Sequence, residues 1–167
     1  MKTFKQFIDE SSLSRIKGKT DKGGVAILSG SRGDKSPKEN KARAKQLDRD
    51  IRGKGLPGAT KVTGRYTERD DKTGKERRVK ERSHVVTSGK KGKRAFKKAV
   101  KSLGKKYGQD SVLAQTKKTG TLSSTRKGGL KDDQGKDIKR VKVGKMRAGR
   151  SGENETVVKK KTFTYEQ

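Results

Sequence analysis

The chain has 167 residues and a formal net charge of +29, because 48 Lys and Arg stand against 19 Asp and Glu. Only 25% of the residues are hydrophobic, no apolar run approaches the ~18 residues of a membrane-spanning helix, and the N-terminus lacks the apolar core of a secretory signal. With no Cys and one His, the composition excludes disulfides, thiolate metal sites, a Cys nucleophile and multi-histidine metal sites.

The first ten residues, MKTFKQFIDE, carry an apolar stripe. Phe4, Phe7 and Ile8 follow the i, i+3, i+4 spacing of one face of a short helix. Such a stripe suits docking into a groove on a partner, and the alternative is a terminal helix that packs on the chain's own core. We expect residues 11–22 to form a linker.

Residues 23–126 carry the sustained apolar periodicity, and we predict that they form the folded domain. The apolar run at 25–28 predicts a buried strand. Ser36 and Glu39 have the spacing of a capping box and Pro37 suits the first helical position, so a helix is predicted to begin there.

The later elements of this region follow in the order strand, strand, helix, strand, strand. A hairpin is predicted from 61–67 into 78–87, and the apolar spacing from Phe96 to Tyr107 predicts a second helix. The whole order is typical of an α+β fold, a split βαβ-like small domain with two helices on one face of an antiparallel sheet. We expect residues 127–167 to be a flexible basic tail that holds at most one β-hairpin.

The basic residues gather in two stretches that favour a polyanionic partner. A charge of +29 repels itself in a compact state, and non-specific contact with double-stranded DNA would compensate it. The alternative is a solvated basic face on a soluble protein. The predicted DNA-binding residues are Lys90, Lys91, Lys93, Arg94, Lys97, Lys98, Lys101, Lys105 and Lys106 on the second helix, and Lys139, Arg140, Lys142, Lys145, Arg147 and Arg150 in the tail.

The terminal decapeptide resembles the capsid-targeting sequence of the internal head proteins of T-even-type tailed phages. The resemblance implies that residues 1–10 direct the chain to the prohead core through Phe4, Phe7 and Ile8. It also implies that the prohead protease cuts after Glu10, at a site formed by Ile8, Glu10 and Ser11. The partners implied are the prohead scaffold core and the prohead protease, and the localisation is the virion interior and, during infection, the host cytoplasm.

The middle region resembles a small bacterial and phage domain family of unknown function. The resemblance rests on Ile27-Leu28-Ser29 with Asn40, on Glu81-Arg82-Ser83-His84, and on the segment at 106–112 that contains Gly108-Gln109. It supports a folded domain and implies no activity. We expect Asn40, Glu81 and Gln109 to hydrogen-bond backbone across the junctions between strands and helices.

Residues for enzyme chemistry are few. His84 lies on the opposite face of its predicted strand from Glu81, so the two form no base–orienter pair. Asp34, Glu39 and Glu81 would be the oxygen ligands of a Mg²⁺-dependent nuclease, but Glu39 suits a cap and Asp34 a turn. The glycine-containing loop at 29–33 matches no nucleotide fingerprint, and backbone contact with a phosphate is its alternative to a plain loop.

The leading hypothesis is therefore a phage internal head protein that is not an enzyme and that uses no metal and no cofactor. It would be processed in the prohead and would bind packaged DNA as a counterion. Two alternatives stay open, a host-directed effector or inhibitor and a metal-dependent nucleic-acid enzyme.

Overall fold

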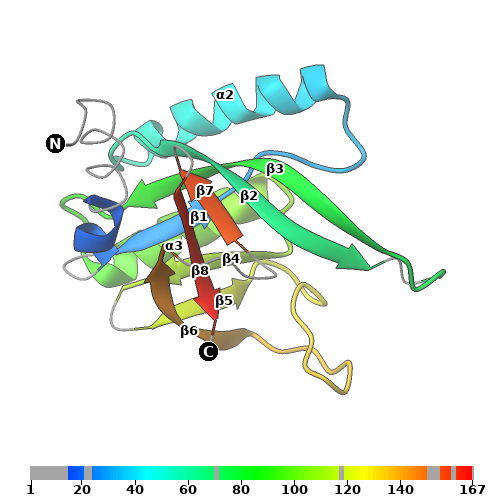
Figure 1. Ribbon diagram of the computed structural model, residues 1–167. Helices are drawn as coiled ribbons and strands as arrows, with labels where there is room; N and C mark the ends of the chain where they lie inside the picture. The colour runs from blue at the N-terminus through cyan, green and yellow to red at the C-terminus, as the bar shows by residue number, and fades with distance from the viewer. Residues whose placement is uncertain are drawn as a thin grey trace, which may run out of the picture.

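The structure is a computed structural model that describes residues 15–20, 24–69, 72–116, 119–149, 155–158 and 161–166. Its strands close into an antiparallel barrel in the order β1-β3-β2-β7-β8-β6-β5-β4 (Figure 1). The strands are β1 (Val25–Leu28), β2 (Thr60–Arg69), β3 (Glu76–Thr87), β4 (Ser111–Gln115), β5 (Gly120–Ser124), β6 (Arg140–Ala148), β7 (Glu155–Val158) and β8 (Lys161–Glu166). The helices with labels are α2 (Pro37–Gly53) and α3 (Lys93–Lys106), and a helical segment at 15–20 precedes β1.

The predicted fold class, a split βαβ-like α+β domain with a flexible basic tail, is wrong. β6, β7 and β8 all belong to the barrel: β6 pairs with β5 and β8, and β7 pairs with β2. The pairing Thr63↔Val157 closes the barrel wall and joins residues that are far apart in the chain. Local periodicity contains no signal for such a contact, so the sheet was expected to stay open.

Both predicted helices form, and they cover one side of the barrel from outside. Ser36 caps α2 by accepting from Glu39 N, while the Glu39 carboxylate accepts from Ser36 N. The buried residues shared by the helices and the strands beneath them are Ala26, Leu28, Leu47, Ile51, Leu56, Val86, Phe96, Val100, Leu103, Tyr107, Val112 and Ala114. The strand members of this cluster therefore face outward.

The alternate strand residues face the barrel interior, since successive side chains point to opposite faces. One end of the interior is filled by a second apolar cluster of Ile16, Val25, Val62, Val85, Val158 and Phe163. Ile16, from the helical segment at 15–20, is 4% exposed and belongs to this cluster. Towards the other end the inward positions become polar, and there the barrel is hollow.

The terminal peptide and the predicted cleavage site lie outside the described residues. Targeting through Phe4, Phe7 and Ile8, and cleavage at the site formed by Ile8, Glu10 and Ser11, therefore stay predictions. Among the helices that the structure describes, none has both the length and the apolar character needed to cross a membrane.

Candidate functional site

A cavity of about 440 Å³ opens at the polar end of the barrel. This volume lies within the ~300–1,000 Å³ range of small-molecule sites. Its wall combines apolar and hydrogen-bonding side chains from all eight strands and the turn before β4. The lining residues are Ile27, Gly64, Arg65, Tyr66, Glu81, Ser83, Gln109, Ser111, Leu113, Leu122, Val143, Thr156, Thr164 and Tyr165.

Glu81 is the one acidic side chain among these lining residues. It comes from β3, and the Tyr66 hydroxyl from β2 donates to its Oε2 at 3.3 Å. Gly64 is the direct partner of Glu81 in the β2–β3 ladder, and Thr156 is paired with Gly64 on the other side. The cavity therefore offers a carboxylate and an aromatic ring next to a position that has no side chain.

The β1–α2 loop is tied to the turn between α3 and β4 at the edge of this cavity. Gln109 Oε1 accepts from Ser29 N at 3.0 Å, as expected for a structural amide. Ser29 Oγ donates to Arg82 O at 2.9 Å, which joins the same loop to β3. Three segments that are far apart in the chain are thus fixed beside Glu81.

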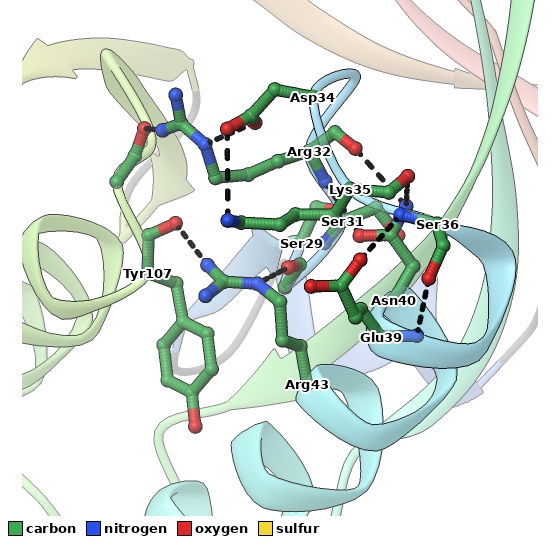
Figure 2. A network of polar contacts seen from close by, with 12 residues as sticks. Ser29, Ser31, Arg32, Asp34, Lys35, Ser36, Glu39, Asn40, Arg43 and Tyr107 are labelled. Atoms are coloured by element: carbon green, nitrogen blue, oxygen red, sulfur yellow. Dashed lines mark hydrogen bonds and ion pairs between the residues drawn. The ribbon is translucent and has the colours of Figure 1, made fainter.

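Arg43 extends this connection from α2. Its Nε donates to Gly30 O at 2.6 Å and its Nη2 to Tyr107 O at 2.7 Å, and its guanidinium lies 5.4 Å from the centre of the Tyr107 ring. Figure 2 shows the Arg43 side chain between the loop and the end of α3. A Cβ at Gly30 would lie 3.1 Å from Arg43 O, so this glycine allows α2 to approach the loop closely. The loop next to the cavity is therefore held on both sides.

Asn40 stabilises the outer part of the same loop (Figure 2). Its Oδ1 accepts from Arg32 N, and its Nδ2 donates to Arg32 O and Lys35 O. Arg32 also donates to Gly108 O at 2.8 Å. The expectation that Asn40 bonds backbone at a strand–helix junction is confirmed.

Two of the three carboxylates weighed for a metal site have other partners. The hydrogen bond from Arg32 Nε lowers the pKa of Asp34, and Lys35 Nζ lies 3.8 Å from Asp34 Oδ2. Hydrogen bonds from the Ser36 backbone and side chain lower the pKa of Glu39. In the described part of the chain, no three His, Cys, Asp or Glu side chains are grouped as a metal would require. Glu81 thus lines the cavity without Asp34 and Glu39.

His84 lies on the outer face of β3, away from the cavity and under α2. It is 1% exposed, and burial lowers the pKa of its imidazole. Its Nε2 is 3.3 Å from Asp48 Oδ1. The expected separation of His84 from Glu81 by strand alternation is observed, because the two residues line different hollows.

The residues predicted to bind DNA lie on the surface, away from the cavity lining. Those on α3 and just before it are exposed, apart from the half-buried Lys91, and Lys106 pairs with Asp50 at 2.7 Å. Those in the second stretch lie on β6 or next to it, and Arg150 is outside the described residues. DNA binding by either stretch stays a prediction.

Comparison with known proteins identifies the family of this chain. The model of the S-adenosylmethionine lyase family matches residues 26–167. The chain belongs to this family. The match begins in β1 and extends to the last residue, so it spans all the strands that build the cavity.

Other likenesses are weak. A solved structure of a phage S-adenosylmethionine lyase in complex with S-methyl-5'-thioadenosine is 20% identical, over 63% of this chain and 83% of that chain, with a TM-score of 0.39. No curated protein matches the chain. The phage lyase overlaps too loosely to transfer residues from one chain to the other.

Membership of a lyase family overturns two predictions. The chain was expected not to be an enzyme, and that expectation is wrong. The leading hypothesis of an internal head protein that acts as a DNA counterion is also wrong, because residues 26–167, most of the chain, match an enzyme family. The prediction relied on net charge, which determines solubility and non-specific contacts but does not indicate which chemistry a cavity supports.

The sequence pattern places Tyr66 on one face of a predicted strand with Val62 but gives it no functional role, and it offers Glu81 only as a metal ligand or a structural group. A usable signal existed in the predicted hairpin. Because paired strand positions alternate faces together, Tyr66, Gly64 and Glu81 share one face once the register is fixed. The polar segment at 70–74, where this hairpin is predicted to turn, does not fix that register, because several loop lengths suit it.

Proposed function

We propose that this protein cleaves S-adenosylmethionine at the bond between sulfur and the methionyl Cγ, and that the barrel cavity is the active site. The observation that carries the proposal is the pairing of Glu81 with Tyr66 inside a cavity of about 440 Å³, in a chain of the S-adenosylmethionine lyase family. Release of S-methyl-5'-thioadenosine, the compound in the phage lyase complex, requires this bond to break.

Charge complementarity supports a sulfonium substrate. In a protein with a net charge of +29, a carboxylate in the cavity wall favours a cationic ligand without touching the sulfonium itself, and Glu81 is the acidic lining residue, beside one basic residue, Arg65. The Tyr66 ring adds a face on which a cation is stabilised. Leu113, Leu122 and Val143 form an apolar section that suits the thioether and purine parts of the substrate.

The charge change during the reaction limits what Glu81 does. The electron pair of the broken bond stays on sulfur, so the positive charge disappears towards the transition state. A carboxylate held on the sulfonium would stabilise the substrate more than the transition state. We therefore assign Glu81 to the ribose hydroxyls, for which a carboxylate is a common acceptor and whose charge does not change.

The four-carbon fragment must supply the electrons that replace the broken bond, since a lyase adds no water. Attack by the substrate's own carboxylate closes a five-membered lactone and needs no base. Loss of a proton from Cβ gives an unsaturated amino acid and needs a base. The identity of the four-carbon product separates these routes, and both release S-methyl-5'-thioadenosine.

The test is conversion of S-adenosylmethionine by the purified protein, followed by mass spectrometry of both products. We expect Glu81→Gln to lower kcat/KM about 10- to 100-fold, the worth of a hydrogen bond to a charged group. Tyr66→Leu should raise KM more than Tyr66→Phe, because only the first loses the ring. Glu76→Gln, at an exposed position at the start of the same strand, is the matched control and should leave kcat/KM unchanged.

A wild-type protein that forms no S-methyl-5'-thioadenosine would contradict the proposed reaction. Equal activity of Glu81→Gln and Glu76→Gln would place the reaction elsewhere. Binding of S-methyl-5'-thioadenosine supplies a further readout, since it retains the ribose. It should weaken in Glu81→Gln if the carboxylate holds the hydroxyls.

A further inference from the structure

A second hollow lies on the outside of the barrel, between α2 and the strands β2 and β3. Figure 1 shows α2 running beside β3 on this side of the molecule. The groove has a volume of about 460 Å³ and is lined by Lys41, Ala44, Lys45, Lys61, Val62, Thr63, Arg82, Ser83, His84 and Val157. It shares only Ser83 with the lining of the barrel cavity.

The groove is more positively charged than the cavity, whose lining holds one acidic residue, Glu81, and one basic residue, Arg65. Four basic side chains, Lys41, Lys45, Lys61 and Arg82, converge on it from three elements, and its lining contains no acidic residue. Asp48 lies at the edge and pairs with Lys61 at 3.3 Å. One carboxylate therefore faces four cations, and the groove has a local excess of positive charge.

His84 gives the floor of the groove a buried polar group. Its side chain is 1% exposed, and within the described part of the chain neither ring nitrogen has a hydrogen-bond partner. The 3.3 Å approach of Nε2 to Asp48 lacks hydrogen-bond alignment. Burial lowers the pKa of this imidazole, so near neutral pH one nitrogen is an N–H donor. A buried polar group of this kind is normally satisfied.

The geometry points to a binding site for the phosphate group of a small phosphorylated metabolite, with His84 as the buried donor. A phosphate has several acceptor oxygens, which suits one imidazole N–H together with Lys and Arg side chains from different directions. The groove is half enclosed between a helix and a sheet, so it holds a compact anion. This site is independent of the proposed lyase reaction, because the substrate of that reaction carries no phosphate.

The single histidine of the chain makes the site directly observable. Protein labelled with isotopes in histidine gives the NMR signals of a single imidazole ring, and these are followed during titration with inorganic phosphate and, separately, with adenosine 5'-monophosphate. Sodium chloride at the same ionic strength is the salt control. We expect a saturable shift with a phosphate-containing ligand and none with chloride.

A matched pair of double variants tests the charges. Lys41→Gln/Lys45→Gln removes two cations of the groove, and Lys97→Gln/Lys101→Gln removes two at the same i, i+4 spacing on the exposed face of α3. Because each exposed charge contact contributes at most ~1 kcal/mol, Lys41→Gln/Lys45→Gln should weaken phosphate binding about tenfold. Lys97→Gln/Lys101→Gln should leave phosphate binding unchanged. The Glu81→Gln variant should bind phosphate as the wild type does, so a failed lyase assay leaves this test intact.

Tighter binding of the nucleotide than of phosphate would identify a nucleotide as the ligand, and equal binding would identify free phosphate. Either result supports the site. The proposal is overturned by the absence of a saturable shift, by an equal shift with chloride, or by equal weakening in both double variants. A shift caused by duplex DNA alone would also overturn it, because the groove would then be part of a nucleic-acid surface.

Discussion

Gly64 controls the space beside Glu81. A Cβ at this position would lie 3.1 Å from Ser83 Oγ and 3.7 Å from Glu81 Cγ, on the inner face of the barrel wall. Its φ is not among the positive values found in the chain, so the conformation does not demand glycine. The room it leaves in the cavity is the simplest reason for glycine in the middle of a strand.

We therefore expect Gly64→Val to abolish turnover of S-adenosylmethionine while the barrel stays folded, because the new side chain fills the cavity. Gly64→Ala should have an intermediate effect, seen as a higher KM. Thr63→Val, on the outer face of the same strand, is the control for changes in β2. Steady-state kinetics and thermal unfolding of the three variants separate the loss of space from the loss of fold, and full activity of Gly64→Val would refute the assignment.

Asp50 links the two helices. It accepts from Tyr107 Oη at 2.6 Å and from Lys106 Nζ at 2.7 Å, and Lys106 is the main cause of the lowered pKa of its carboxyl. Burial, together with the bond to Asp50, raises the pKa of Tyr107. A carboxyl whose pKa is lower in the folded than in the unfolded protein stabilises the fold at pH values above its unfolded pKa, near 3.9. This stabilisation is lost as the pH falls through the pKa of the folded state.

Asp50→Asn should thus destabilise the protein at pH 7 by about 1.5–3 kcal/mol, the range for hydrogen bonds to charged groups. The difference from the wild type should shrink as the pH is lowered below ~4. Urea unfolding at pH 7 and pH 3 measures both values. Asp133→Asn, an exposed carboxylate, is the control, and a difference that does not change with pH would argue against this ion pair.

At the scale of elements, α3 approaches β4 closely because Gly104 stands in the contact. A Cβ there would overlap Val112 Cγ1, whereas a Cβ at Gly53, the last residue of α2, meets nothing within 4 Å. Both residues are helical and neither has a positive φ. Packing, rather than backbone conformation, therefore distinguishes these glycines.

The same substitution should have opposite effects at the two sites. Gly53→Ala should be neutral or stabilising by up to ~1 kcal/mol, from helix propensity. Gly104→Ala should destabilise by about 1–3 kcal/mol, as expected for an overpacked core. Chemical denaturation of both variants measures the contrast, and an equal gain at both positions would disprove the close contact.

At the scale of the whole molecule, the barrel depends on its last strands. Val158 and Phe163 pack in the interior with Val25, Val62 and Val85. Their removal would expose this cluster and leave β2 without its partner β7. Stability here arises from pairings between segments far apart in the chain.

We expect a fragment that ends at residue 126 to lose cooperative unfolding, although it keeps both labelled helices and five of the strands. Circular dichroism during urea titration of the fragment and the full chain tests this. A cooperative transition in the fragment would mean that 23–126 is an independent domain, as the periodicity alone suggested.

The sequence by itself determined the charge, the capped start of α2, the amphipathic face of α3, and the strands on either side of them. These features depend on residues within a few positions of each other, so they appear as local patterns. The sequence also contained Glu81, Asn40 and Gln109, but only their identity as polar groups near a core.

Only the tertiary structure decided that the sheet is closed and that Tyr66 and Glu81 share a cavity with residues of β7 and β8. The register Gly64↔Thr156 joins residues far apart in the chain, and each strand could pair with several others at similar local cost. The choice among these pairings is made when the interior side chains of all strands are buried together. The site therefore exists only once the barrel has closed.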